Sequence, residues 1–243
     1  MRFIVMHRTD ARWEAGAIPN REFIASVGKL IGELAGAGIL LGAEGLRASS
    51  QGVRLRFSAG RRQVIKGPFT GENELSAGFW IVQVPAIEEA LEWASRLAAA
   101  IGDLEIDVRP VTEPWDIGMT SAPENLTLRR YMLLRKATAA SEAGIRLSPR
   151  QRADLGRVLE EMTRTGALLT AADLQPSAKG KRFRFAGGRA TATDGPFTET
   201  KELVAGYVMF EAPTMERAAE WASRYGEVVG SPEVDLLGIE EQQ

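Results

Sequence analysis

Two glutamates stand at equivalent places in a repeated segment of this 243-residue chain. Glu74 and Glu202 are each followed by leucine. Each could be a catalytic residue, because a carboxylate beside an apolar cleft can have a raised pKa and act as a general base. A glutamate in a solvated loop would have no such role. The sequence leaves both interpretations open.

An aspartate-glycine step adds a third candidate acid or base. Asp194 precedes Gly195, and its counterpart in the other copy is Lys66, so the two copies cannot do identical work at this place. We take Asp194 as a candidate catalytic residue and Lys66 as a candidate ligand-binding residue. The alternative for Asp194 is structural, since aspartate before glycine commonly forms turns.

The chain has a single histidine, His7, near the end of a predicted strand. It could transfer protons as a catalytic residue, since imidazole titrates near neutrality, or it could be structural. Its counterpart is Arg135, which keeps a basic group at this position. Glu44 lies in a predicted Gly-Ala-Glu-Gly turn and has Ala172 as its counterpart, so a role of Glu44 in ligand binding would belong to one copy.

Four arginines are candidates for binding an anionic ligand. Arg54 and Arg56 in the first copy, and Arg182 and Arg184 in the second, alternate with other side chains on predicted strands. Because successive side chains of a strand point to opposite faces, the two arginines of each strand share a face. On a face that lines a cavity, they could hold a carboxylate or a phenolate. On a face toward water, they would keep an edge strand soluble.

Composition excludes several kinds of site. The chain has no cysteine and one histidine, which rules out a thiolate nucleophile, a zinc finger and a metal site of several histidines within one chain. There is no Walker loop or nucleophile elbow, and the glycines within 36–38 follow a predicted helix, which fails the context of a dinucleotide loop. We therefore predict neither a metal nor a cofactor.

Charge and hydropathy limit the partners and the location. The 30 Lys and Arg residues against 32 Asp and Glu residues leave no positive excess for a phosphate backbone. The apolar run at the N-terminus is too short for a signal peptide, and no segment approaches the roughly 18 apolar residues of a membrane span. We predict a cytoplasmic protein that binds neither nucleic acid nor membranes.

The positions compared above come from an internal duplication. Residues 67–96 and 195–224 share 16 identities in 30 positions without a gap. A repeat of this length is a duplicated domain, because solenoid units recur about every 20 to 50 residues. Residues 112–127 contain two prolines and little periodicity, which is typical of a linker. The predicted division is copy 1 at 1–117, a linker at 118–127 and copy 2 at 128–243.

Each copy has the pattern strand, helix, strands, helix, strand. The apolar stripe after Asn20 and the capping signal at Ser148–Gln151 predict the first helix of each copy. Alternating residues at 53–57 and 62–66 predict a hairpin, and the apolar spacing within 87–97 predicts a second helix. This order corresponds to a βαββαβ unit, whose antiparallel sheet carries both helices on one side.

The predicted strands are apolar on both faces, as at 79–82 and 207–210. An uncovered sheet face of large apolar side chains would be an exposed patch. We expect the equivalent face of the other copy to cover it, so that the sheets of two ferredoxin-like (βαββαβ) repeats of an α+β protein pack against each other within one chain, with the helices outside. The small-molecule ligand would then lie between the repeats of a monomer with pseudo-twofold symmetry or of a homodimer.

The string Asp194–Phe197, continued by Thr198–Glu202 and Ala205–Tyr207, resembles the YCII-related, DGPF-domain family. The first copy matches the family through Gly67–Phe69 and Ala90–Ala94. The resemblance covers both copies, and it implies a ferredoxin-like, dimeric α+β barrel architecture.

The resemblance also bears on chemistry. The YciI branch of the family is thought to use a histidine and an aspartate in a cleft, and one relative is similar to dehydrochlorinases. No histidine occurs at 20–36 or 148–165, the predicted first helices, so that catalytic pair is not carried over to this chain.

Two functions of different classes follow. The first is a cofactor-free enzyme that acts on a small organic anion by carboxylate acid-base chemistry, in a lyase-, isomerase- or dehydrochlorinase-like reaction. The alternative is a non-catalytic small-molecule-binding or regulatory accessory protein. A purely structural dimer module is the third interpretation.

Overall fold

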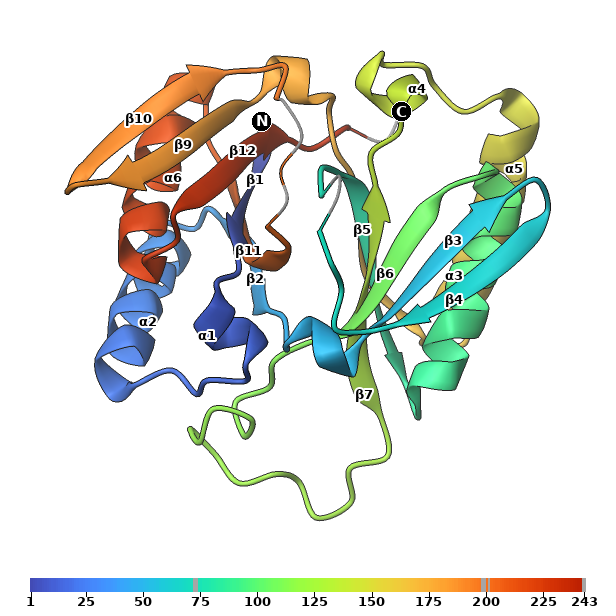
Figure 1. Ribbon diagram of the computed structural model, residues 1–243, viewed down its shortest axis with the longest axis horizontal. Coiled ribbons are helices and arrows are strands. Elements are labelled where there is room, and N and C mark those ends of the chain that lie inside the picture. The colour runs from blue at the N-terminus through green and yellow to red at the C-terminus, as the bar shows by residue number, and fades with distance from the viewer. Residues whose placement is uncertain (72–73, 198–199, 201, 242–243) are drawn as a thin grey trace. The chain divides into compact units, whose positions relative to one another are not determined.

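The computed structural model describes residues 1–71, 74–197, 200 and 202–241. Thr198, Glu199 and Lys201 of the second motif string lie outside these residues. The described residues form two antiparallel six-stranded sheets and six α-helices (Figure 1). The protein is therefore α+β, in agreement with the two predicted ferredoxin-like repeats.

The first compact unit consists mainly of Met1–Leu46 and Leu174–Gln243, with Glu74 among its other residues. Its helices are α1 (Ala11–Glu14), α2 (Arg21–Gly36) and α6 (Met215–Val229), with a 3-10 turn η2 (Ser177–Lys179). Its strands are β1 (Arg2–Arg8), β2 (Leu40–Gly45), β9 (Lys181–Ala186), β10 (Arg189–Asp194), β11 (Val204–Glu211) and β12 (Glu233–Gly238). They form a sheet in the order β10-β9-β12-β1-β11-β2.

The second compact unit consists of Arg47–Thr70 and Leu75–Asp173. Its helices are α3 (Ile87–Ile101), α4 (Ala139–Glu142) and α5 (Pro149–Arg164), with a 3-10 turn η1 (Ser49–Gln51). Its strands are β3 (Val53–Ser58), β4 (Arg61–Lys66), β5 (Ser76–Val84), β6 (Glu105–Pro110), β7 (Arg129–Lys136) and β8 (Leu168–Asp173). They form a sheet in the order β4-β3-β6-β7-β5-β8.

The compact units and the sequence copies divide the chain differently. In the first sheet, β11 of the second copy lies between β1 and β2 of the first copy, and in the second sheet β5 of the first copy lies between β7 and β8 of the second. Each unit thus joins the opening strand-helix-strand segment of one copy to the remaining elements of the other. As a result, residues 118–127 belong to a connection between β6 and β7, which pair in one sheet.

The predicted capping signals begin the helices as expected. The Asn20 side chain accepts a hydrogen bond from the Phe23 N–H at 2.8 Å, which starts α2. At α5, Ser148 and Gln151 form a reciprocal capping box, with Pro149 in the first turn. These local bonds satisfy N–H groups that have no partner within the helix, so the sequence alone fixes where both helices begin.

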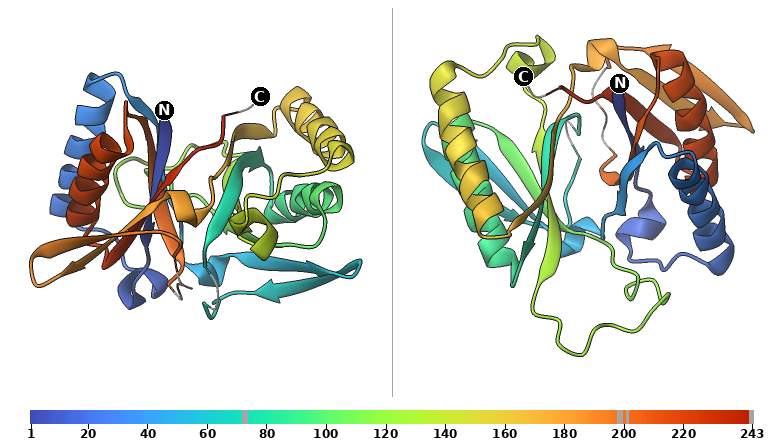
Figure 2. Two further views of the ribbon diagram at one scale, coloured as in Figure 1. Left: turned by 90° about the horizontal axis from the view of Figure 1, so that it is seen from above. Right: turned by 180° about the vertical axis from the view of Figure 1, so that it is seen from behind.

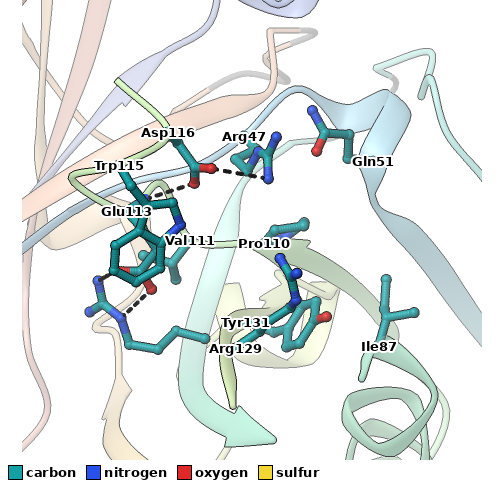
Figure 3. Close-up of a pocket in the computed structure, with 11 residues that line it drawn as sticks. Arg47, Gln51, Ile87, Pro110, Val111, Glu113, Trp115, Asp116, Arg129 and Tyr131 are labelled. Atoms are coloured by element: carbon teal, nitrogen blue, oxygen red, sulfur yellow. Dashed lines mark hydrogen bonds and ion pairs between the residues drawn. The ribbon is translucent and has the colours of Figure 1, made fainter. Parts of the chain in front are cut away.

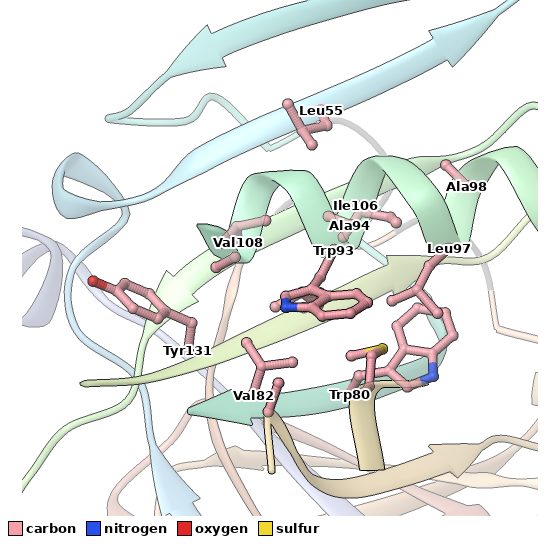
Figure 4. Close-up of a cluster of buried hydrophobic side chains, with 14 of the residues drawn as sticks. Leu55, Trp80, Val82, Trp93, Ala94, Leu97, Ala98, Ile106, Val108 and Tyr131 are labelled. Atoms are coloured by element: carbon pink, nitrogen blue, oxygen red, sulfur yellow. The ribbon is translucent and has the colours of Figure 1, made fainter. Parts of the chain in front are cut away.

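Each sheet carries two helices on one face. Figure 2 shows α2 beside α6 and α3 beside α5, each pair covering its own sheet. In the second unit, Trp93 and Leu97 of α3 pack with Trp80 of β5 and Ile106 of β6 (Figure 4). In the first unit, Phe3 and the other side chains of the corresponding cluster are buried in the same way. The helix-facing core follows the predicted apolar stripes.

The opposite side of the strands is also buried. Ile4 and Met6 alternate with Phe3 and Val5 along β1, and all four are at most 1 % exposed. Tyr207 on β11 is buried as well. Both faces of these strands therefore carry buried apolar side chains, as predicted. In the part of the chain that the structure describes, no helix combines the length and the apolar character needed to cross a membrane.

Candidate functional site

Each unit contains a buried cluster of acidic and basic side chains. In the second unit, Asp107 accepts hydrogen bonds from Arg54 Nε and Nη2 at 2.6 and 2.9 Å. The Lys136 Nζ lies 2.9 Å from Oδ2 of the same carboxylate. All three side chains are at most 4 % exposed. Two cations therefore share one buried carboxylate.

The first unit repeats this cluster at the equivalent positions. Asp235 accepts from Arg182 Nε and Nη2 at 2.6 and 3.0 Å, and it also accepts from Arg8 Nη2. Arg8 Nη1 donates to the backbone carbonyl of Glu74 at 3.2 Å. Sequence reasoning missed Asp107 and Asp235, although the alternation Glu-x-Asp on both last strands places two carboxylates opposite the two arginines.

The predicted arginine pairs do share a face. Glu105 lies 3.3 Å from Arg54 Nε and 2.7 Å from Arg56 Nε. Glu233 lies 3.1 Å from Arg182 Nε and 2.9 Å from Arg184 Nε. The edge-strand interpretation is wrong, because β4 and β10 occupy the sheet edges and β3 and β9 lie inside them. The carboxylates of the chain itself surround these guanidinium groups, and their role in ligand binding stays a prediction.

The Gly-Pro-Phe segments hold the clusters in place. The Arg54 guanidinium lies 4.7 Å from the centre of the Phe69 ring, and the Arg182 guanidinium lies 4.5 Å from that of Phe197. The Phe69 N–H donates to Ser49 Oγ at 3.0 Å, which ties the segment to η1. These contacts agree with the interpretation of the motif as a tight, packed connection.

The charges around Asp107 determine its ionisation. Burial by itself raises the pKa of this carboxyl, but the positive charges of Lys136 and Arg54 and their hydrogen bonds outweigh burial, so that the net pKa lies below its ordinary value. The stability that Asp107 contributes is thus present above the unfolded-state pKa of about 3.9 and is lost as the pH falls through the lower folded-state pKa.

We therefore expect the stability difference between the parent protein and an Asp107→Asn variant to shrink in acid. Urea unfolding of both proteins, repeated between about pH 3 and pH 6, measures this difference. The difference should be constant near pH 6 and smaller below about pH 4. A difference that grows toward low pH would contradict the assignment.

The two repeated glutamates lie in different environments. Glu74 is fully buried in the first unit, and its N–H donates to the Thr200 carbonyl at 3.0 Å. Glu202 is exposed, and its Oε2 accepts from Thr200 Oγ1 at 3.2 Å. The solvated interpretation is therefore wrong for Glu74 and correct for Glu202. A catalytic role of either residue stays a prediction.

Asp194 and Lys66 are exposed at the ends of edge strands. Asp194 ends β10 and forms an ion pair with Lys181 on β9, its partner in the strand register. Lys66 ends β4. The two residues belong to different sheets. Their proposed catalytic and ligand-binding roles stay predictions.

His7 and Glu44 are brought to adjoining places in the first sheet. His7 pairs with Gly206 of β11, whose other neighbour in the register is Gly45, next to Glu44. Glu44 lies in strand β2, so the predicted turn at this place is wrong, because pairing with β11 extends the chain despite its glycines. His7 Nδ1 lies 2.8 Å from the Tyr225 Oη on α6.

A pocket of about 270 Å³ lies within the second unit. Its walls come from the C-terminal end of β6, the N-terminal end of β7, the start of α3 and the connection that follows β6. Figure 3 shows Trp115, Glu113 and Asp116 on one side of the pocket and Tyr131 and Ile87 on another. Two aromatic rings and an aliphatic side chain thus form walls on which an apolar molecule could pack.

The charged side chains of the pocket are mainly arginines. Arg47, Arg129 and Arg130 line it, together with the carboxylates of Glu113 and Asp116. Arg130 is bound by both oxygens of Glu113 at 2.7 and 2.8 Å. Arg47 Nη1 lies 3.4 Å from Asp116 Oδ1. The lining has one more positive than negative side chain.

The connection after β6 has local structure that presents its side chains to the pocket. The Asp116 N–H donates to the Glu113 carbonyl at 2.9 Å, and the Glu113 N–H donates to Asp116 Oδ2 at 3.0 Å. The Met119 N–H donates to the Pro114 carbonyl at 2.9 Å. These bonds close a turn around Trp115, which sets the indole in the pocket wall.

Tyr131 gives the pocket a neutral hydroxyl. Burial raises the pKa of this phenol, against the charge of Arg129 and with that of Glu88. The phenol is therefore protonated at neutral pH and can donate a hydrogen bond. Among the residues that the structure describes, no group of three or more His, Asp and Glu side chains could hold a metal ion.

Sequence reasoning did not find the pocket. It treated residues 112–127 as a linker, and none of its candidate site residues lines the pocket. The signal was a tryptophan and two carboxylates in a long segment without regular structure, since long loops of this kind are often functional. Only the pairing of β6 with β7 brings that segment back over its own sheet.

Comparison with known proteins assigns the chain to a family. The model of the YCII-related domain matches residues 1–113 and 129–229. An uncharacterized protein, R00369, from Rhizobium meliloti (strain 1021) is 30 % identical over 89 residues, which cover 35 % of this chain and 72 % of that protein. This chain therefore belongs to the YCII-related family and carries two copies of its domain.

Proposed function

We propose that this protein binds a small organic anion in the pocket of the second unit and does not convert it chemically. The observation that carries the proposal is the position of Arg129. It lines the pocket and is exposed, and it forms no ion pair with any residue that the structure describes. A guanidinium in this position can bind a carboxylate through two parallel hydrogen bonds.

The rest of the lining supports an organic ligand over a simple ion. Trp115 and Tyr131 offer ring surfaces, and Ile87, Pro110 and Val111 are apolar. Binding pockets are typically apolar with a few polar groups that fix the orientation of the ligand. An anion with a carbon skeleton would use both kinds of lining.

The distribution of the acid-base candidates favours binding without turnover. Glu74, Glu202, Asp194 and His7 all belong to the first unit, whereas the pocket belongs to the second. The carboxylates at the pocket, Glu113 and Asp116, are engaged with arginines. A lyase- or isomerase-like reaction of the bound anion stays a prediction, and the experiment below includes it.

The test is calorimetric titration of the full chain with small aliphatic and aromatic carboxylates, together with an Arg129→Gln variant. We expect Arg129→Gln to weaken binding about tenfold, as for the loss of a charge-assisted hydrogen bond. The matched control is Arg150→Gln, which removes a highly exposed guanidinium on α5 away from the pocket. That control should bind like the parent protein.

Two results would overturn the proposal. Either no carboxylate binds with a Kd below about 1 mM, or Arg129→Gln and Arg150→Gln have the same affinity as the parent. Nuclear magnetic resonance of the ligand after long incubation separates the two functional classes. An unchanged ligand spectrum supports a binding protein, and accumulation of a product establishes an enzyme.

A further inference from the structure

The loop over the pocket already places a carboxylate on one of the pocket's arginines. Asp116 Oδ1 lies 3.4 Å from Arg47 Nη1, and the two side chains are 16 % and 33 % exposed. This separation gives an ion pair beyond the usual N–H···O range of 2.7 to about 3.2 Å. The neighbouring Glu113 binds Arg130 at 2.7 and 2.8 Å. The same loop therefore has one tight and one loose ionic contact.

We propose that Asp116 is an internal competitor for the ligand, and that the ligand is a planar, single-ring aromatic monocarboxylate. The inference rests on the proposed function, because it concerns the same pocket. The carboxylate of the ligand, bound by Arg129, also takes the place of Asp116 on Arg47, and its ring packs against Trp115 and Tyr131. Asp116 then moves toward solvent.

The size and charge of the pocket set this ligand class. A volume of about 270 Å³ accommodates one ring with short substituents and is slightly below the roughly 300 Å³ at which ligand pockets usually start. Arg129 forms no ion pair with any described residue and Arg47 is released by Asp116, so the two oxygens of one carboxylate can contact both guanidinium groups. Two aromatic walls favour a flat π-system, because offset and edge-to-face ring contacts add to apolar burial.

The geometry of the loop allows Asp116 to give way while the loop stays attached. Glu113 anchors the loop to Arg130 at the base of β7. The Asp116 Oδ2 accepts from the Glu113 N–H, so a rotation of the carboxylate can release Arg47 and leave the turn closed. Trp115 adjoins Asp116 in the chain, and its fluorescence should report the exchange.

The experiment uses an Asp116→Asn variant of the full chain. Asparagine keeps a side-chain oxygen for the Glu113 N–H and removes only the negative charge. We expect Asp116→Asn to bind benzoate about two- to fivefold more tightly than the parent, as for the loss of a competing exposed ion pair. The control Glu161→Gln removes a carboxylate from the Arg96 pair, outside the pocket, and should leave the affinity unchanged.

Two further variants and ligands sharpen the test. In an Arg47→Gln background, Asp116→Asn should give no gain, because the arginine for which the carboxylates compete is absent. Cyclohexanecarboxylate should bind more weakly than benzoate to every variant. Circular dichroism of each variant confirms that the fold is retained.

The outcomes separate this inference from the proposed function. If the parent binds benzoate and Asp116→Asn binds it equally well, the competition by Asp116 is disproved and the binding function stands. If cyclohexanecarboxylate binds as tightly as benzoate, the aromatic class is wrong. If no variant binds any organic anion, both the inference and the proposed function fail.

Discussion

Replacing Asp107 by asparagine should lower the free energy of unfolding of the second unit by about 3–5 kcal/mol. The Asp107 side chain is 1 % exposed and binds both Arg54 and Lys136. Both buried cations contact this carboxylate, and Glu105 lies 3.3 Å from Arg54 Nε. An unpaired buried charge is costly because the interior cannot replace the lost hydration.

Urea denaturation followed by circular dichroism measures this change at neutral pH. The matched control is Glu161→Gln, which breaks an ion pair whose side chains are 35 % and 39 % exposed, so its loss of stability should be much smaller. Asp235→Asn repeats the test independently in the first unit. A loss for Asp107→Asn no larger than that of the control would show that the cluster does not behave as a buried one.

A second result concerns the cluster as a whole. Replacing Arg54, Asp107 and Lys136 together by methionine, leucine and methionine should recover much of the stability lost in Asp107→Asn. The reason is that the stability lost in Asp107→Asn results from uncompensated buried charge and not from a loss of side-chain volume. If the triple variant is less stable than Asp107→Asn, packing around the cluster contributes more than its charges.

Alanine at Gly67 or Gly195 should destabilise the protein by about 3 kcal/mol or more. A Cβ atom on Gly67 would lie 1.8 Å from the Ser49 carbonyl oxygen, and one on Gly195 would lie 1.8 Å from that of Ser177. Both obstacles are backbone atoms, so relief requires displacement of a 3-10 turn. That displacement would also move Phe69 away from Arg54, or Phe197 away from Arg182.

The control for the glycine variants is Gly156→Ala in α5. A Cβ there has no heavy atom within 4 Å, and alanine is a better helix former, so this variant should gain about 0.5–1 kcal/mol. Thermal and urea unfolding of the three variants give the comparison. If Gly67→Ala is as stable as the parent, the close approach of residue 67 to the Ser49 carbonyl does not require glycine.

Much of the local structure was predictable from the sequence. Asn20 and Ser148 begin helices because their side chains bond nearby N–H groups, a contact that depends only on residues three positions apart. The alternation of side chains along 53–57 and 62–66 predicted the β3–β4 hairpin, which also depends only on residues close together in the sequence. The duplication itself is visible without a structure, since it is a property of residue identity.

The pairing of strands between the copies was not predictable in this way. β1 and β7 occupy equivalent positions and have similar apolar patterns, so either could lie beside β5 or β11 and bury the same faces. The structure pairs β7 with β5 and β1 with β11. When two strand pairings have nearly the same apolar pattern, the path of the connecting segments decides between them. Local periodicity contains no information about that path.

The sequence by itself determined the family, the duplication, the α+β class and the shared face of the arginine pairs, because these depend on residue identity and on spacing within one element. Only the tertiary structure decided that Asp107 and Asp235 bind those arginines, that Glu74 is buried while Glu202 is exposed, and that Trp115 lines a pocket. Each of these depends on contacts between segments far apart in the chain. Such contacts are set by strand exchange and loop closure and leave no periodic signal in the residues that make them.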